Sequence, residues 1–148
     1  MAQNLREQIS DNIVTVLKDM QDPRPVIVTR EPFVATELAI TQFPALLITA
    51  VNEERETVTM GVPGVGRRMG TLDFTIRGFV RGNELDRKRN DLIERIEEQL
   101  DSDRYRELSA VGVIDSQVVT VKIIERQPPL AEIEILFRVR YNYLRTQV

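Results

Sequence analysis

The chain lacks cysteine, histidine and tryptophan altogether, although it is 148 residues long. Without cysteine and histidine it has none of the side chains that usually hold structural zinc, iron–sulfur clusters or haem. The same two absences remove cysteine nucleophiles, Ser-His-Asp triads and disulfide bonds. We therefore expect no cofactor and no metal site. An enzyme built on this chain would have to use carboxylates or lysine instead.

Long apolar stretches are also missing. No run of residues has the length and apolarity of a membrane-spanning helix, and the opening residues Met1-Ala2-Gln3-Asn4 are polar rather than typical of a signal peptide. We therefore expect no membrane partner. A chain of this size with 42% hydrophobic residues can build one ordinary core without a disulfide or a metal.

Lysine is scarce among the basic residues. Only Lys18, Lys88 and Lys122 are lysines, so 17 of the 20 basic residues are arginine, and 23 acidic residues bring the net charge to −3. A negative net charge argues against a general nucleic-acid-binding surface. Arginine is enriched where proteins meet proteins. A GC-rich genome produces the same excess, so the excess points to protein contacts only beside other evidence.

Two amphipathic helices are predicted from apolar residues at helical spacing. The first carries the stripe Leu5, Ile9, Ile13, Val16, Leu17 and Met20. It ends before Pro23 and Pro25, because proline cannot continue a helix. The second runs from Glu84 to about Leu100, with Asn83 as its N-cap. Its stripe consists of Leu85, Leu92, Ile93, Ile96 and Leu100.

Alternating and β-branched runs predict the strands. The clearest is residues 71–81, in which apolar residues alternate with polar ones. The other predicted strands cover residues 26–30, 45–51, 118–125 and 130–144, with a weak edge element at Val111, Val113 and Ile114. Residues 52–56 form a polar stretch after the second of these strands.

The last two predicted strands form a hairpin across Pro128-Pro129. An antiparallel register places Ile123 opposite Ile133 and Val119 opposite Phe137 on one face, and Lys122 opposite Glu134 on the other. Both faces then match in character, which supports the pairing.

The order of elements is a helix, several strands, a helix and a final hairpin. It predicts an α+β fold: a mainly antiparallel or mixed sheet packed against two helices, with a projecting β-hairpin, in a single domain spanning residues 1–148. The aromatic residues Phe74, Phe137, Tyr141 and Tyr143 share strand faces with branched aliphatic residues. They are better explained as core than as a platform for stacking bases.

A glycine-rich loop, Gly64-Val65-Gly66 followed by Gly70, invites comparison with nucleotide-binding loops. Such loops need a helix directly after the glycines, whereas a strand follows here. We therefore interpret the loop as the tip of a β-hairpin. Its residues Val62, Pro63 and Val65, beside Arg67 and Arg68, suit a contact with another protein.

Carboxylates are numerous enough to consider an enzyme. Asp73, Glu132 and Glu134 lie on the polar sides of predicted strands, and Asp101 and Asp103 lie in a loop. The strand glutamates face lysine and arginine, which indicates structural ion pairs. No histidine is present to act as a base near neutral pH. We expect no enzymatic activity and no catalytic residue, and a carboxylate-dependent enzyme is kept as a distant alternative.

The densest basic cluster, Arg87-Lys88-Arg89, alternates with acidic residues and reads as a solvated start of the second helix. Arg89 differs because it falls inside the apolar stripe. One interpretation is that its side chain extends to water; the sharper one is that it meets a carboxylate of a neighbouring subunit. Arg138 and Arg140 on the last strand are further candidates for a protein interface.

The whole order of elements resembles the bacteriophage tail-terminator (tail completion) family. The resemblance covers nearly the whole chain and rests on the N-terminal amphipathic helix, the segment Phe43-Pro44-Ala45-Leu46-Leu47-Ile48, the glycine-rich hairpin with its long return strand, the second helix and the closing Tyr141-x-Tyr143 strand. It implies a virion structural protein that forms a ring, expected to be a homohexamer. Such a ring caps the tail tube, stops its polymerisation and joins the tail to the neck or head.

The resemblance also implies the partners and the location. These are further copies of the chain, the tail tube protein, a neck or connector protein and, in a contractile tail, the sheath protein. DNA only passes through the lumen of the ring. The chain is expected in the virion, at the junction of tail and neck, and in the host cytoplasm during assembly. The main alternative is a head-completion or neck connector subunit.

Overall fold

The computed structural model describes residues 4–57, 67–106, 108 and 112–144. Helices and strands occur in the order α1 (Leu5–Lys18), β1 (Ile27–Thr29), the short 3-10 helices η1 (Ala35–Glu37) and η2 (Ile40–Gln42), β2 (Ala45–Thr57), β3 (Arg67–Arg81), α2 (Leu85–Asp101), β4 (Val113–Ile124) and β5 (Leu130–Leu144). The tip of the predicted hairpin lies outside the described residues.

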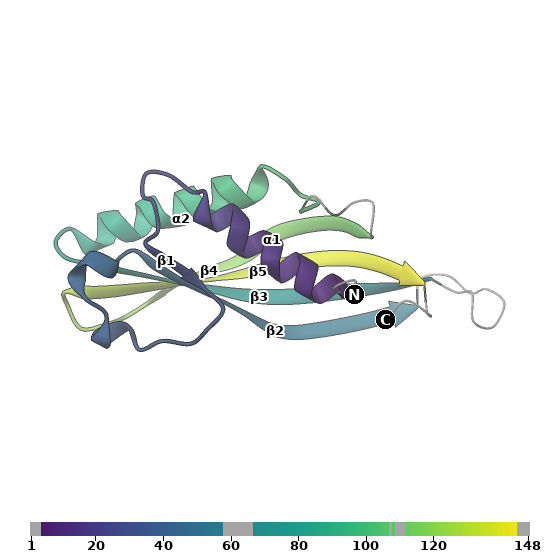
Figure 1. The fold of residues 1–148 in the computed structure, drawn as a ribbon, viewed down its shortest axis with the longest axis horizontal. Coiled ribbons are helices and arrows are strands. Elements are labelled where there is room, and N and C mark those ends of the chain that lie inside the picture. Colours follow the sequence, from purple (N-terminus) through teal and green to yellow (C-terminus); the bar gives the residue numbers. More distant parts are fainter. Residues whose placement is uncertain (1–3, 58–66, 107, 109–111, 145–148) are drawn as a thin grey trace.

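The strands form one five-stranded sheet with the order β1-β2-β3-β5-β4. The short β1 runs parallel to β2, and the other neighbouring strands are antiparallel. Both helices lie on the same face of the sheet (Figure 1). The prediction of an α+β fold with a mixed sheet packed against two helices is therefore confirmed.

The main core lies between the helices and this face of the sheet. Alternate residues of β5 supply it, and Ile133, Ile135, Phe137 and Val139 are fully buried, as the alternating pattern predicts. The predicted stripe of α1 faces the same core, with Ile9, Ile13, Leu17 and Met20 buried. Two of its other members, Leu5 and Val16, pack at the rim.

The two helices begin differently. In α1 the side chain of Asn4 accepts a hydrogen bond from the Glu7 amide (2.9 Å), which is a standard N-cap. The predicted cap of α2 by Asn83 is wrong, because Glu84 occupies the cap position in a left-handed conformation, φ 54°, without a side-chain cap bond. Gly82, with φ 124°, makes the turn that shifts the helix start.

Two strands are longer than the sequence predicts. The polar residues 52–56, which the sequence pattern does not assign to a strand, continue β2 to Thr57. Val113 and Ile114, expected in a separate weak element, begin β4, while Val111 lies outside the described residues. The reason is the same in both cases: β3 and β5 are each 15 residues long and supply hydrogen-bonding partners along their whole length, whatever the side chains are.

The predicted register of the last hairpin is partly confirmed. Ile123 lies opposite Ile133 and Lys122 lies opposite Glu134. Val119 does not lie opposite Phe137, because a bulge between Val118 and Thr120 brings Val118 to that place. The extra residue breaks the alternation, so that Val118 shares the core face with Phe137 whereas Thr120 lies on the open face opposite Leu136. The side-chain pattern of the sequence does not predict this bulge.

The connection from β1 to β2 packs against the other face of the sheet, at one end only. Its residues Phe33, Ala35 and Leu38 join Phe79 and Leu130 in a second, smaller apolar cluster. The rings of Phe33 and Phe79 meet edge to face, with centroids 5.4 Å apart. The rest of this face carries no helix in the described part of the chain, and we call it the open face.

Candidate interaction surface

The open face is polar where the connection leaves it uncovered. By strand register it carries Asp73, Thr75 and Arg77 of β3, together with Glu134, Leu136, Arg138 and Arg140 of β5. Side chains in a strand alternate between faces, so these residues are the direct neighbours of the apolar core residues on the same strands. A sheet face of this kind is available for contact with another molecule.

Glu132 is the most deeply buried charge of this face, with 3% of its side chain exposed. Arg77 Nε donates to one carboxylate oxygen (2.9 Å), and Arg126 Nε donates to the other (2.8 Å). Both guanidinium groups also lie over the ring of Phe79, at 5.3 and 5.6 Å from its centroid. This arrangement compensates the buried carboxylate and closes the smaller apolar cluster.

Asp73 and Arg138 form a second pair on the open face. Nε and Nη2 of Arg138 donate to the two oxygens of Asp73, at 2.8 and 3.2 Å. These hydrogen bonds, more than the charge attraction, raise the pKa of Arg138. Arg138, predicted as an interface residue, is therefore engaged within its own subunit, whereas Arg140 beside it is exposed.

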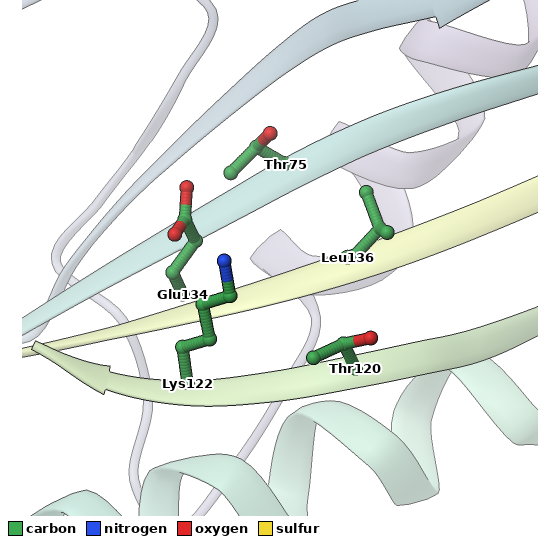
Figure 2. Close-up of a pocket in the computed structure, with 5 residues that line it drawn as sticks. All are labelled: Thr75, Thr120, Lys122, Glu134 and Leu136. Carbon is green, nitrogen blue, oxygen red and sulfur yellow. The ribbon is translucent and has the colours of Figure 1, made fainter.

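A shallow depression of about 150 Å³ lies between these strands, lined by Thr75, Thr120, Lys122, Glu134 and Leu136. Figure 2 shows the Lys122 and Glu134 side chains on neighbouring strands, as the predicted pair requires. The volume is small for a site that encloses a small molecule, for which about 300 Å³ or more is usual. The depression is better explained as a shallow hollow in a surface that contacts another protein.

A wider hollow of about 450 Å³ lies between the start of α2 and the Phe43-Pro44 segment. The charged residues around it make contacts that stabilise the fold. Lys88 Nζ donates to the carbonyl of Arg81 (3.2 Å), and Arg95 Nε donates to the carbonyl of Asp22 (2.9 Å), which ties the α1–β1 connection to α2.

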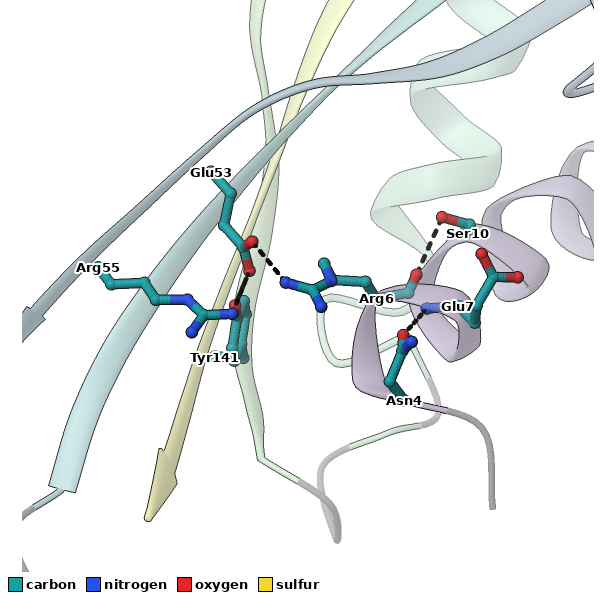
Figure 3. Close-up of polar contacts among 7 residues, drawn as sticks. All are labelled: Asn4, Arg6, Glu7, Ser10, Glu53, Arg55 and Tyr141. Carbon is teal, nitrogen blue, oxygen red and sulfur yellow. Dashed lines mark hydrogen bonds and ion pairs between the residues drawn. The ribbon is translucent and has the colours of Figure 1, made fainter. Parts of the chain in front are cut away.

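Glu53 is at the centre of a polar cluster at the opposite end of the sheet (Figure 3). The buried Tyr141 hydroxyl donates to its carboxylate, Arg6 of α1 lies at 2.9 Å and Arg55 at 3.5 Å. Burial alone would raise the pKa of Glu53, but the hydrogen bonds from Tyr141 and Arg6 hold the pKa below its ordinary value. Burial, followed by the bond to Glu53, raises the pKa of Tyr141. The cluster joins α1 to β2 and β5.

Arg106 is another polar residue at the core, and its side chain is fully buried. Its guanidinium donates to the carbonyl of Leu100 in the last turn of α2 and to the carbonyl of Asp103 just after the helix. It also lies 5.7 Å from the centroid of the Phe137 ring. Cations beside the last carbonyls stabilise a helix end. The role of Arg106 is therefore structural.

The remaining predicted interface residues are only partly described. Val62, Pro63 and Val65 lie outside the described residues. Arg67 and Arg68 belong to β3, opposite Leu144 and Tyr143 of β5. Arg89 pairs with Asp86 of its own helix at 3.1 Å. Its contact with a neighbouring subunit stays a prediction.

Several residues that the fold brings together could not be found from the sequence pattern. Arg126 lies between the last two predicted strands, Glu53 lies in a stretch described only as polar, and Arg106 lies in a polar connection. Only the strand glutamates were expected beside basic residues, and Glu132 confirms this. Across the described ranges, no group of three acidic side chains gathers closely enough to hold a metal ion. No helix in the same ranges has the length and apolarity to span a membrane.

Comparison with known proteins adds little. No protein-family model matches the chain, and no curated protein matches it. Among solved structures, one similar chain belongs to the "Virion of native gene transfer agent (GTA) particle", with a TM-score of 0.46 and 10% sequence identity over 95% of this chain and 96% of that chain. A similarity of this size does not establish a shared function.

Proposed function

We propose that this chain is a virion structural protein of the tail-terminator kind. Copies of it form a ring, expected to be a hexamer, which caps the tail tube, stops its growth and joins the tail to the neck. The tube, neck and, in a contractile tail, sheath proteins are its partners, and DNA passes through the lumen. The proposal joins the resemblance seen in the sequence to the arrangement of the sheet.

The observation that carries the proposal is the direction of the two outer long strands. β4 ends the sheet on one side, and β2 reaches beyond the short β1 on the other. Through the antiparallel pairs with β3 and β5, β4 and β2 run in opposite directions. Copies related by a rotation about an axis inclined to the strands can therefore join β4 to β2 as antiparallel strands. A head-to-tail contact of this kind generates a ring when the rotation closes.

The polar groups of the open face fit a protein that acts by shape. The carboxylate-dependent enzyme alternative relies on Asp73 and Glu134. Asp73 is bound by Arg138, and Glu134 lies opposite Lys122 beside the depression of only about 150 Å³. Neither is poised as an acid or base beside a cavity that could enclose a substrate. The geometry therefore favours contact surfaces over chemistry.

Electron microscopy and sizing of the purified protein test the proposal. We expect ring-shaped particles, and we expect them at one end of isolated tail tubes after mixing. The proposal is contradicted if the protein stays monomeric at high concentration and does not bind isolated tail tubes. Rings that bind heads but never tubes favour the neck connector alternative.

The hairpin tip gives a second test. Deleting residues 62–66 should leave the subunit folded, because they lie beyond the paired ends of β2 and β3. The deletion should impair attachment to tube, sheath or neighbour. Circular dichroism checks the fold and a tail-assembly assay checks the attachment; normal assembly by the deleted form would refute a role for the tip.

A further inference from the structure

We infer that Lys122 on β4 of one copy pairs with Glu54 on β2 of the next copy, where the two sheet edges join as antiparallel strands. The inference rests on the proposed ring and specifies the contact that builds it. Both side chains are exposed in the single subunit.

The edge formed by β4 is unusually apolar. Val119, Val121 and Ile123 have 40%, 37% and 52% of their surface exposed, so every second residue of its second half is an exposed apolar side chain. On the other side of the sheet, β1 pairs with β2 only at Ala45–Leu47. Within the described residues no strand adds to the remainder of β2. A long edge with exposed apolar residues is a template for pairing with another strand.

The position of β1 dictates how the two edges can meet. Lys122 of β4 lies opposite Glu134 of β5, which in turn lies opposite Arg77 of β3. Arg77 lies opposite Leu47 of β2, so Lys122 and Leu47 are at the same position along the strand direction. In the next copy, the place beside its Leu47 is already taken by its own β1. The next copy must therefore be displaced along the strands, so that β4 lies beside the free part of β2. Closed sheets need such a stagger, since it tilts their strands.

The faces of the sheet and the charges then select the register. Directly opposite residues share a face, and Lys122 lies on the open face, so its partner must lie on the open face too. Beyond the β2 bulge these residues are Asn52, Glu54 and Glu56. Glu54 gives Lys122 an opposite charge and still leaves residues on both sides of it to pair. The displacement then equals six residue steps along β3, from Arg77 to Thr71, which is about 20 Å.

The absence of cysteine allows a direct test by disulfide cross-linking. The protein carrying both Lys122→Cys and Glu54→Cys is oxidised mildly and analysed on a non-reducing gel. The two positions cannot bond within one subunit, because β3 and β5 separate their strands by about 14 Å and a disulfide needs Cα atoms closer than about 7 Å. We expect a ladder of multimers that ends at the number of subunits in the ring and collapses on reduction.

Matched variants define the outcomes of the cross-linking. Lys122→Cys alone should run as a monomer on the non-reducing gel. Disulfide-linked dimers from it would mean that β4 pairs with β4 and would overturn the inference. Gln117→Cys with Glu54→Cys uses the same two strands, about 13 Å away along β4, and should give no ladder. If the Gln117/Glu54 pair gave cross-linked multimers in the same yield as the Lys122/Glu54 pair, the inference would also be overturned.

Charge exchange provides an independent measurement. Lys122→Glu and Glu54→Lys should each weaken ring association about threefold to tenfold, and combining them in one chain should restore it, as measured by analytical ultracentrifugation. Rings of the unaltered protein without cross-linking or charge rescue would overturn the inference and leave the proposed function intact. An unaltered protein without rings would overturn both.

Discussion

The two faces of the sheet are built from the same strands, yet different forces stabilise them. On the face toward the helices, β5 contributes Ile133, Ile135 and Phe137, all fully buried. On the open face, β5 contributes the intervening residues Glu134 and Leu136. The carboxylates of Asp73 and Glu132 lie on the same face and are paired with arginines. The first face gains its stability from apolar burial. The second depends on charges and leaves surface for partners.

The largest difference between the faces should appear on truncating neighbouring residues of β5. Phe137→Ala should lower the free energy of unfolding by about 3–5 kcal/mol, because the ring is fully buried and the helices cannot fill the space. Leu136→Ala, on the open face, should cost about 1 kcal/mol or less. Urea denaturation measures both. Equal losses would mean that the open face is packed like the core.

Glu132 is expected to matter more than any other charge of the open face. Glu132→Gln should lower the free energy of unfolding by about 2 kcal/mol, since it leaves Arg77 and Arg126 without their shared carboxylate. Glu134→Gln, two residues away and only partly buried, is the matched control and should change the free energy of unfolding by less than about 0.5 kcal/mol. Similar effects of the two substitutions in urea denaturation would contradict the structural role of Glu132.

Tyr141 tests the polar cluster that joins α1 to the sheet. Tyr141→Phe should lower the free energy of unfolding by about 1 kcal/mol at neutral pH, because the hydroxyl no longer donates to Glu53.

The pH dependence follows from the same contact. The pKa of Glu53 is lower in the folded protein than its ordinary value of 4.5, so its stabilisation is present above that pH and is lost as the pH falls through the folded value. Tyr141→Phe should reduce the stability that is lost on acidification, and Glu53→Gln should abolish the part of that loss that is due to Glu53. An acid loss of unchanged size in denaturation curves between pH 3 and pH 6 would contradict the assignment.

The smallest effect is expected at an exposed pair beside the β4 edge. Arg104 lies 3.1 Å from Asp115 with 60% of its side chain exposed. Arg104→Ala should lower the free energy of unfolding by about 0.5 kcal/mol at low salt, and the difference should vanish near 1 M salt. A salt-independent loss in thermal denaturation would show that the arginine acts by packing instead.

The sequence by itself determined the elements and the core. Alternation in β3 and β5 and the stripe of α1 fix which side chains must leave water, and this depends only on local geometry and hydrophobicity. The register of Ile123 with Ile133 and of Lys122 with Glu134 followed from the same pattern.

The tertiary structure alone decided the strand order, the bulges, the continuation of β2 through polar residues and the partners of Glu53, Arg106 and Glu132. These features depend on residues far apart in the chain, because backbone groups pair with whichever strand lies beside them and a buried charge takes the nearest compensating group. Which edges remain open, and thus where another copy can attach, also follows only from the assembled sheet.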